Sequence, residues 1–373
     1  MKIGIDARMY APECTGISRY IRELTYHLFD IDKTNEYLMF MLEPEYSKFE
    51  APNEKVKKIK VDSYWYGYKE QLILPWQMLK TGCDLIHFPN FNTPLIYPKK
   101  SVVTVHDITP FFFSGHRRQS KWRDRAFRQV FSRSVKRATK VIAVSEATKK
   151  DIIRYFKIAP EKIEVIYNGL DQKFFRKSSP SELQKLKDKY KIRSPFILYV
   201  GVWRNHKNVI GLLKAFKLIL DKYQCDYQLV LLGKELPKYP DIRKTWQQLN
   251  LEKNLVLPGF VSDEELLLFY QASDLLVIPS LAEGFGFTGL ESLASGTPVA
   301  ASNIAALEEV LGESASYFNP HRFEEMAEVI FNLLTNQSLR QEKLAKAENQ
   351  IKKYSWLKNA EQTLKLYQDV LEK

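Results

Sequence analysis

The 373-residue sequence is short of cysteine and contains no long apolar run. Its three cysteines, Cys14, Cys83 and Cys225, lie far apart and form no Cys-x-x-Cys pair, so we expect neither a disulfide framework nor a zinc site. No apolar stretch approaches the roughly 20 residues that a membrane span requires. The opening MKIGIDARMY lacks the apolar block of a signal peptide. These absences predict a cytoplasmic protein.

Closely spaced carboxylates of the kind that hold a catalytic metal are also scarce. Asp30 and Asp32 in FDIDKTNEY have the Asp-x-Asp spacing of one known kind of metal site. They lie between a predicted helix and a predicted strand start, away from the carboxyl ends of strands, where parallel sheets bind ligands. We interpret the pair as part of a surface turn, and we expect no metal and no bound cofactor.

Short apolar runs alternate with amphipathic helical patterns along the chain. Most runs end in Gly, Asp, Ser or Pro and lead into a helix, which is typical of α/β proteins with doubly wound parallel sheets. We predict an N-terminal domain over residues 1–172, a charged linker over 173–194 and a C-terminal domain over 195–353. The predicted strands cover residues 2–6, 36–42, 84–89, 101–107, 140–145, 163–169, 196–201, 227–233, 254–259, 274–280, 297–303 and 316–319.

Residues 279–299, PSLAEGFGFTGLESLASGTPV, combine a strand end, a glycine-rich turn and a helix. Glu283 stands at the strand end, and Glu291 lies inside the helix. The backbone N–H groups of the turn and the positive end of the helix suit a phosphate. Each carboxylate suits a pair of sugar hydroxyls. The alternative is a surface loop whose glycines only interrupt the chain and whose Glu291 is solvated.

Further motifs extend this pattern over nearly the whole chain. They are TGISRY after the first strand, VHDITP, VSEATKKDI and VIYNGLD in the first half, and LYVGVWRNHKNV, LPGFVSDEEL and EGFGFTGLESLASGTPVAAS in the second. Together they resemble the retaining nucleotide-sugar glycosyltransferases of family 4 (group 1), of the bacterial polysaccharide and lipopolysaccharide type. The resemblance implies the GT-B fold, in which two Rossmann-like domains face each other across a cleft. It also implies that the final helix, residues 354–373, packs back on the N-terminal domain.

The resemblance assigns roles to individual residues of the C-terminal half. Glu283 would contact hydroxyls of the donor sugar, Glu291 would hold the ribose, and the backbone between them would meet the diphosphate or the sugar. Lys207 occupies the lysine position of the family and would stabilise the leaving diphosphate. The family's arginine often follows the glycine directly, but Val202 stands there, so Arg204 is the nearest candidate. The residues expected to bind the donor are Gly16, Asn168, Gly201, Phe260, Val261, Gly284, Phe285, Gly286, Phe287, Thr288 and Glu291.

His106 ends a predicted strand of the N-terminal domain. A lone histidine beside an apolar strand is usually structural, but in the family a histidine at this place lines the cleft near the donor sugar and the reaction centre. With Glu283, Lys207 and Arg204 it completes the expected catalytic set. The alternative for Lys207 and Arg204 is a solvated loop, and the alternative for Gly16 is a glycine that only opens a helix.

The resemblance therefore predicts a retaining transferase that works without a metal. It would move a hexose from a nucleotide-diphosphate sugar, such as GDP-mannose or a UDP-sugar, to a saccharide or lipid-linked saccharide acceptor in surface polysaccharide or lipopolysaccharide biosynthesis. Two alternatives stay open: a nucleotide-sugar epimerase or hydrolase of the same fold, and a non-catalytic protein that binds nucleic acid or a membrane. The base, the sugar, the acceptor and the linkage do not follow from the sequence.

The net charge of +12 is concentrated in residues 115–140. From Arg117 to Lys140 there are ten lysines or arginines and one acid, Asp124, around an apolar helical stripe. This segment is either a helix with a solvated back or a cationic face that holds the protein on the inner face of the plasma membrane. Nucleic acid is not expected, because a recognition helix or an aromatic RNA-binding motif is absent. The residues assigned to membrane or acceptor are Arg117, Arg118, Lys121, Trp122, Arg123, Arg125 and Arg128.

Overall fold

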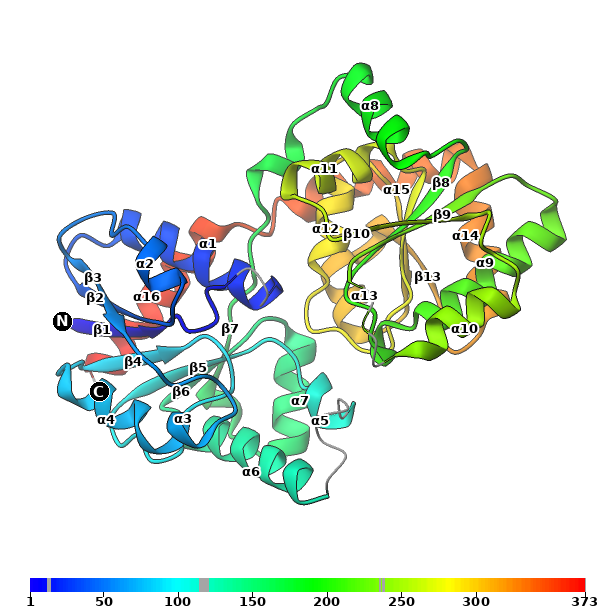
Figure 1. The fold of residues 1–373 in the computed structure, drawn as a ribbon. Helices are drawn as coiled ribbons and strands as arrows, with labels where there is room; N and C mark the ends of the chain where they lie inside the picture. The colour runs from blue at the N-terminus through cyan, green and yellow to red at the C-terminus, as the bar shows by residue number, and fades with distance from the viewer. Residues whose placement is uncertain (12–14, 114–120, 235, 237–238, 373) are drawn as a thin grey trace. The chain divides into compact units, whose positions relative to one another are not determined.

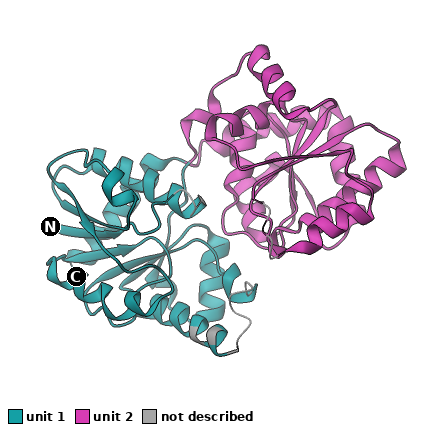
Figure 2. Ribbon diagram, viewed as in Figure 1, with its two compact units in different colours: residues 1–169, 355–373 teal, residues 170–354 magenta. Residues whose placement is uncertain are grey.

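The structure is a computed structural model, described over residues 1–11, 15–113, 121–234, 236 and 239–372. The chain divides into two compact units (Figure 2). The first contains residues 1–169 and 355–373, and the second contains residues 170–354. Each is a parallel α/β layer structure, so the fold class predicted from the alternating strand and helix patterns is confirmed.

In the described part of the first unit, seven parallel strands form one sheet in the order β3-β2-β1-β4-β5-β6-β7 (Figure 1). Strand β3 was not among the predicted strands. Its sequence VKKIK contains three lysines and only two apolar residues, so it is not a continuous apolar run. Lysine is common on edge strands. The strands are β1 (Lys2–Asp6), β2 (Glu36–Met41), β3 (Val56–Lys60), β4 (Leu85–Phe88), β5 (Ser101–Val105), β6 (Lys140–Ala143) and β7 (Ile163–Val165).

Helices cover both faces of this sheet. Helix α7 shows how the sequence sets its ends: the Ser145 hydroxyl accepts a hydrogen bond from the backbone N–H of Thr148, and Lys157 ends the helix in the left-handed conformation. The helices of the unit are α1 (Thr15–Ile31), α2 (Glu45–Lys48), α3 (Tyr68–Leu72), α4 (Leu74–Lys80), α5 (Thr109–Phe112), α6 (Lys121–Arg137), α7 (Glu146–Phe156), the 3-10 turn η3 (Pro160–Lys162) and α16 (Trp356–Glu372).

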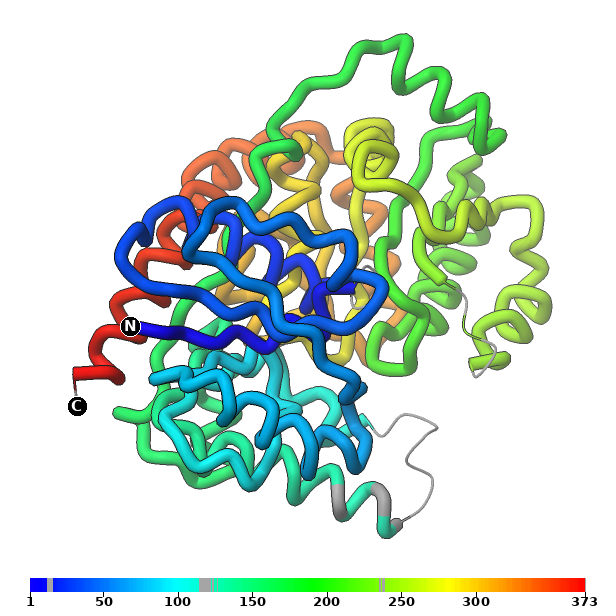
Figure 3. The backbone as a smooth tube through the Cα atoms, turned by 60° about the vertical axis from the view of Figure 1, so that its left-hand side comes forward, coloured from blue at the N-terminus to red at the C-terminus, as the bar shows by residue number. Residues whose placement is uncertain are grey.

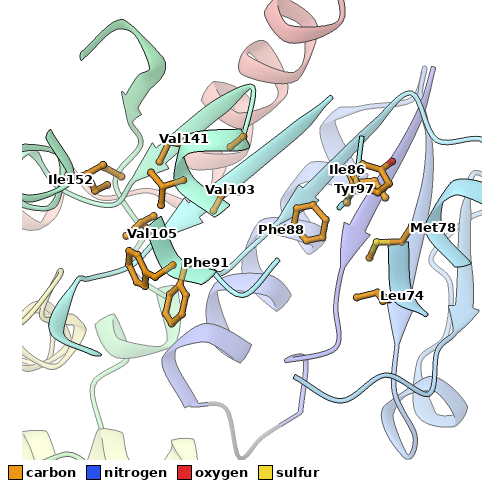
Figure 4. Close-up of a cluster of buried hydrophobic side chains, with 14 of the residues drawn as sticks. Leu74, Met78, Ile86, Phe88, Phe91, Tyr97, Val103, Val105, Val141 and Ile152 are labelled. Carbon is orange, nitrogen blue, oxygen red and sulfur yellow. The ribbon is translucent and has the colours of Figure 1, made fainter. Parts of the chain in front are cut away.

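A large apolar cluster fills one side of the sheet (Figure 4). Phe88, Val103 and Val141 from the central strands belong to the same cluster as Met78 of α4 and Ile152 of α7. Neighbouring residues of a strand point to opposite faces, so His87 and Thr104 lie on the other side. Helices α1 and α16 pack against each other in this unit, and in Figures 1 and 3 the end of α16 lies near the start of β1.

In the described part of the second unit, six parallel strands follow the order β10-β9-β8-β11-β12-β13. Strand β8 therefore has β9 on one side and β11 on the other. Such a reversal of strand order is where open parallel sheets bind ligands. The strands are β8 (Phe196–Val200), β9 (Gln228–Leu232), β10 (Leu255–Gly259), β11 (Leu275–Ile278), β12 (Val299–Ser302) and β13 (Ala315–Phe318).

The segment expected to be a linker, residues 173–194, is counted within the second unit and is folded. A capping box between Ser179 and Glu182 starts helix α8. At its other end, Lys189 Nζ and the Tyr190 hydroxyl lie 2.6 and 3.0 Å from a carboxylate oxygen of Glu265 in α11. The unit contains η4 (Gln172–Phe175), α8 (Pro180–Tyr190), η5 (Asn205–Lys207), α9 (Val209–Tyr223), α10 (Pro240–Gln248), α11 (Asp263–Ala272), α12 (Phe287–Ala294), α13 (Ala305–Leu311), η6 (Gly312–Ser314), α14 (Phe323–Thr335) and α15 (Gln337–Ile351).

None of the helices, over the residues that the structure describes, is both long enough and apolar enough to cross a membrane.

Candidate functional site

The loops that follow β8 and β11 meet at the point where the strand order of the second unit reverses. The backbone N–H of Leu281 donates to the carbonyl of His206 at 2.7 Å and joins the two loops. Lys207 Nζ lies 2.5 Å from Glu283 Oε1, and the Ser280 hydroxyl donates to the same oxygen at 2.8 Å. Two of the residues expected to be catalytic thus form one ion pair at a strand end.

The surroundings of this pair keep Glu283 ionised. Burial acts to raise the pKa of Glu283, but the charge of Lys207 and the hydrogen bonds from Lys207 and Ser280 outweigh burial, and the pKa is lowered. The side chains of Lys207 and Glu283 are 25% and 15% exposed. One side of the pair therefore stays open to a ligand. Beside it, burial and the repulsion from Lys207 lower the pKa of His206 to about 4, so His206 is neutral near pH 7.

A tight turn leads from Glu283 into α12. Gly286 precedes the helix with φ +85°, and a Cβ atom there would lie 2.5 Å from a methyl carbon of Leu307. Glycine is therefore required for both the backbone angle and the packing. Phe285 is buried, and its ring meets those of Phe287 and Tyr354 edge-on. The turn presents the positive end of the α12 dipole beside the Lys207–Glu283 pair.

Glu291 lies inside α12 and is only 2% exposed. The Tyr270 hydroxyl from α11 donates to Glu291 Oε2 at 2.7 Å. The alternative of a solvated Glu291 in a surface loop is therefore wrong, because the carboxylate is buried and held by a neighbouring helix. Tyr270 itself was not expected, since it is an ordinary apolar position of an amphipathic helix in the sequence.

Other residues expected to bind the donor follow strand ends of the second unit or lie at the start of α12. Gly201 follows β8 and Gly233 follows β9. Their backbones lie so close together that a Cβ atom on Gly233 would lie 2.1 Å from the Gly201 carbonyl oxygen. The Arg204 side chain is exposed and has no ion-pair partner among the residues described. Phe260, after β10, is 76% exposed, and Val261 is half-buried. Gly284 is buried, and Thr288 is half-buried in the first turn of α12.

Tyr199 also adjoins this site, although sequence reasoning missed it. Its hydroxyl is buried and has no hydrogen-bond partner within the described parts of the chain. Burial, followed by the charge of Glu283, raises the pKa of Tyr199. A Cβ atom at Gly201 would come 3.0 Å from the Tyr199 hydroxyl oxygen, so the glycine keeps the space above this hydroxyl clear.

In the first unit, His106 lies at the end of β5 and is half-buried. Its Nε2 is 2.9 Å from the carbonyl oxygen of Pro89, and its ring packs edge-on against Tyr20. Burial lowers the pKa of His106 to about 4, against the opposing effect of the Pro89 carbonyl. A carbonyl only accepts, so in the neutral ring Nε2 carries the hydrogen. Nδ1 has no hydrogen-bond partner among the described residues.

Two other residues of the first unit belong to the expected set. Gly16 is exposed in the first turn of α1, with no atom within 4 Å of the position that a Cβ would occupy. Asn168 is 1% exposed, and neither polar atom of its side chain has a partner within the described chain. The next residue, Gly169, packs so closely on α16 that a Cβ would lie 2.2 Å from the Trp356 backbone nitrogen.

A buried ionic network at the end of β1 escaped sequence reasoning altogether. Arg8 is 2% exposed and binds Asp6 through two nitrogens at 2.8 and 2.7 Å and Glu70 at 2.8 Å. Asn92 donates to Glu70 at 3.0 Å, and Arg8 also donates to the carbonyl of Ser63 at 3.0 Å. Burial raises the pKa of Glu70 despite the nearby guanidinium. The network braces the loops after β1, β3 and β4.

The basic segment is only partly described. Arg117 and Arg118 lie outside the described residues, and the side chains of Lys121 and Arg123 are not described. In α6, Trp122 is 76% exposed and Arg125 is exposed. Arg128 differs from the expected free cation, because its Nε lies 2.7 Å from Asp124 Oδ2 and its guanidinium covers the ring of Phe111.

Asp30 and Asp32 have different surroundings. Asp32 is 6% exposed and accepts hydrogen bonds from Thr34, Asn35 and Tyr37, whereas Asp30 is exposed near Lys33. Across the described positions, no group of three or more His, Cys, Asp or Glu side chains is arranged to hold a metal ion.

Two family models match the chain. Residues 15–174 match the model "Glycosyltransferase Family 4", and residues 183–354 match "Glycosyl transferases group 1". The serotype-specific mannosyltransferase WbdA of Escherichia coli is 30% identical over 269 residues, which are 70% of this chain and 32% of WbdA. The chain thus spans about a third of that relative's length. The O-antigen chain mannosyltransferase B of Escherichia coli is 28% identical over 293 residues, covering 78% of this chain and 76% of that protein.

Solved structures share the fold. Sucrose-phosphate synthase from Thermosynechococcus elongatus has a TM-score of 0.81 at 19% identity, covering 100% of this chain and 99% of the other. Anabaena HepE in complex with UDP-glucose has a TM-score of 0.75 at 20% identity, covering 99% and 100%. These likenesses establish the GT-B fold of the chain.

Proposed function

This chain belongs to the group 1 glycosyltransferases of family 4, and we propose that it transfers a hexose from a nucleotide-diphosphate sugar to a saccharide acceptor, with retention of configuration. The observation that carries the proposal is the Lys207–Glu283 ion pair beside the glycine turn and the positive end of α12. The cation and the helix start suit the diphosphate of such a donor. The carboxylates of Glu283 and Glu291 suit the hydroxyls of its sugar and of its ribose.

The role of each group follows from its charge. The glycosidic bond breaks as negative charge grows on the diphosphate, and Lys207 and the exposed Arg204 stabilise that charge. Glu283 accepts hydrogen bonds from the hydroxyls of the transferred sugar and holds it in place. Glu291, fixed by Tyr270, accepts from the ribose hydroxyls. His106 accepts a hydrogen bond at Nδ1 from a hydroxyl of the reacting sugar.

The proposed chemistry takes place at one face of the sugar. The leaving phosphate itself accepts the proton of the acceptor hydroxyl, which attacks from the same side, so the anomeric configuration is kept. No side chain serves as the nucleophile in this scheme. Because Lys207 and Arg204 supply the positive charge, the reaction needs no metal.

The donor and acceptor classes are proposed from the relatives. The two relatives described above are named as mannosyltransferases, one of them of the O-antigen chain, and a structural neighbour was solved with UDP-glucose. GDP-mannose and UDP-hexoses are therefore the donors to test first. The acceptor is a growing surface polysaccharide or its lipid-linked precursor.

A donor screen tests the function. The protein is incubated with GDP-mannose, UDP-glucose or UDP-galactose, with and without short mannose oligosaccharides, while nucleoside diphosphate and new glycoside are both measured. The proposal predicts acceptor-dependent release of diphosphate and an α-linked product from an α-linked donor. Equal release without acceptor indicates a hydrolase, and a changed donor sugar indicates an epimerase. Thermal unfolding that does not respond to UDP or GDP contradicts a nucleotide site altogether.

The exposed aromatic face of the first unit supports a peripheral contact with a membrane. Tyr68, Leu72 and Trp76 of α3 and α4 are 72%, 65% and 62% exposed. Lys80 Nζ lies 3.6 Å from the centre of the Trp76 ring. Aromatic side chains with basic neighbours suit the interface of an anionic bilayer. This face, with Trp122 and Arg125 of α6, would bring the protein to a lipid-linked acceptor.

Sedimentation with lipid vesicles tests the membrane contact. Vesicles that contain phosphatidylglycerol should retain the wild-type protein, and vesicles of phosphatidylcholine alone should not. Trp76→Ser and Arg125→Ser should each reduce the bound fraction. Lys185→Ser, at an exposed position of α8, is the charge-matched control. Unchanged binding in both variants, or no binding by the wild type, rejects the contact and leaves the transferase proposal intact.

A further inference from the structure

A chain of buried polar side chains crosses the first unit behind His106. The Tyr367 hydroxyl oxygen lies 2.6 Å from His87 Nδ1, and His87 Nε2 lies 2.8 Å from the Thr104 hydroxyl oxygen. Thr104 in turn lies 3.1 Å from the hydroxyl oxygen of Tyr20. These residues come from α16, β4, β5 and α1, so the chain links the C-terminal helix through the sheet to the N-terminal helix.

Every member of this chain is fully buried, with 0% of its surface exposed. Polar groups in such a place are costly unless each one has a partner. Burial, with a smaller effect from His106, lowers the pKa of His87 to about 3. His87 is therefore neutral near pH 7, with one nitrogen that donates and one that accepts. It bridges two hydroxyls, and the loss of either hydroxyl leaves a buried nitrogen unpaired.

One end of this chain, Tyr20, contacts His106, and Pro89, which holds the other side of His106, lies two residues after His87. The Tyr20 ring meets the imidazole of His106 edge-on, with 4.8 Å between ring centres and 81° between ring planes. Pro89 directly follows β4, two residues after His87, and its carbonyl oxygen is 2.9 Å from His106 Nε2. The ring of His106 is thus confined between Tyr20 and Pro89, and His87 and Thr104 connect the elements that carry them.

We infer that Thr104 and His87 are positioning residues that, through Tyr20, hold the imidazole of His106 with Nε2 on Pro89 and Nδ1 toward the substrate. This inference rests on the proposed function, in which His106 contacts the reacting sugar. It goes beyond that function because it assigns a catalytic consequence to residues that cannot touch substrate. If this chain of hydrogen bonds had a purely structural role, it would attach α16 to the sheet and would not affect catalysis.

Paired substitutions at Thr104 separate these two roles. Thr104→Val keeps the shape of the side chain but removes the hydroxyl, whereas Thr104→Ser keeps the hydroxyl. We expect kcat to fall about 10- to 100-fold in Thr104→Val, because a displaced catalytic group costs rate on that scale. Thr104→Ser should stay within about threefold of the wild type. Assays well below the melting temperature of each variant exclude unfolding as the cause.

His87 allows a second matched pair. The amide of His87→Gln lies near the place of Nε2 and keeps the link to Thr104, whereas that of His87→Asn lies near Nδ1 and keeps the link to Tyr367. Both variants should lose stability, but the asparagine variant should lose more of kcat. Equal kcat in the two variants, together with a normal kcat in Thr104→Val, would overturn the positioning role.

A double-mutant cycle tests whether the effect passes through His106. Once His106→Ala has removed the imidazole, adding Thr104→Val should slow the enzyme no further. A Thr104→Val effect that persists in full in the double variant contradicts the inference. Full activity of His106→Ala instead contradicts the role of His106 in the proposed function.

Nitrogen NMR of the imidazoles gives a readout that needs no activity. The chain contains only six histidines, so the ring nitrogens can be assigned by substitution. Wild-type His106 should carry its hydrogen on Nε2, and Thr104→Val should produce a mixture of the two neutral forms. A wild-type spectrum with the hydrogen on Nδ1, or an unchanged spectrum in Thr104→Val, rejects the inference whatever the enzyme assays show.

Discussion

Replacing Glu283 by glutamine isolates the contribution of one negative charge at the proposed donor site. The amide has the size of the carboxylate and still offers an oxygen to Lys207 and Ser280. Each charge-assisted hydrogen bond to a sugar hydroxyl contributes about 1.5–3 kcal/mol, and two hydroxyls would be affected. With about 3 kcal/mol as the net loss in the transition state, kcat/KM should fall roughly 100-fold.

The fold should survive this change. Lys207 and Glu283 are 25% and 15% exposed, so water reaches the lysine once its partner is neutral. We expect the free energy of unfolding to fall by about 1 kcal/mol, as for a partly exposed ion pair. Denaturant unfolding gives this value separately from the loss of activity. Glu324→Gln, at an exposed position of α14, is the control for the same chemical change outside the site.

The pH dependence supplies a second test of the same charge. The pKa of Glu283 is lowered in the folded protein. The contribution of the ionised Glu283 to stability and to donor binding is therefore complete above the ordinary pKa of glutamate. It is lost only as the pH falls through the lower pKa that Glu283 has in the folded protein. Between pH 7 and pH 5 the wild type should show no loss of kcat/KM from this group. Glu283→Gln with kcat/KM within threefold of the wild type at pH 7 would refute the assignment of Glu283 to the donor sugar.

Three further predictions concern neighbouring groups. Tyr270→Phe removes the hydrogen-bond donor to buried Glu291 and should lower the free energy of unfolding by about 1–3 kcal/mol. It should also weaken the binding of nucleoside diphosphate, which calorimetry can measure. An unchanged affinity would argue against a contact between Glu291 and the ribose. The pKa values of His87 and His106 are lowered in the folded state to about 3 and about 4. The free energy of unfolding should therefore be highest above the pKa of histidine in the unfolded chain and should fall as the pH decreases from 6.5 toward 4. Urea unfolding should show this decline, and the decline should be smaller in His87→Gln. Excess EDTA should leave turnover unchanged if Lys207 supplies the charge that a metal would otherwise supply; a loss restored by Mg²⁺ or Mn²⁺ would contradict this.

Local sequence patterns were enough to predict much of the fold. Strands such as β8 and β11 are continuous apolar runs because both of their faces are buried, and such runs are visible without any knowledge of the partner strand. Strand β3 was missed because only one side of an edge strand needs apolar residues, and its lysines conceal the pattern. Glu283, Gly286 and Glu291 were found because they lie within one short segment, where a turn and a helix start determine their neighbours.

Groups that are brought together from different elements could not be predicted in this way. Arg8 with Glu70, Tyr270 with Glu291, and His87 with Tyr367 join residues far apart in the chain. Nothing in the sequence beside these residues marks them, because a buried polar group depends on partners supplied by other elements. For Arg128, the ion pair with Asp124 lies within α6 at i,i+4 spacing, but the contact of its guanidinium with Phe111 joins two separate helices and is decided by the tertiary structure. The sequence by itself determined the order of elements and the local turn at residues 283–291. Only the tertiary structure decided which charges are paired, which are buried and which remain open to a ligand, because those properties arise from contacts between distant segments.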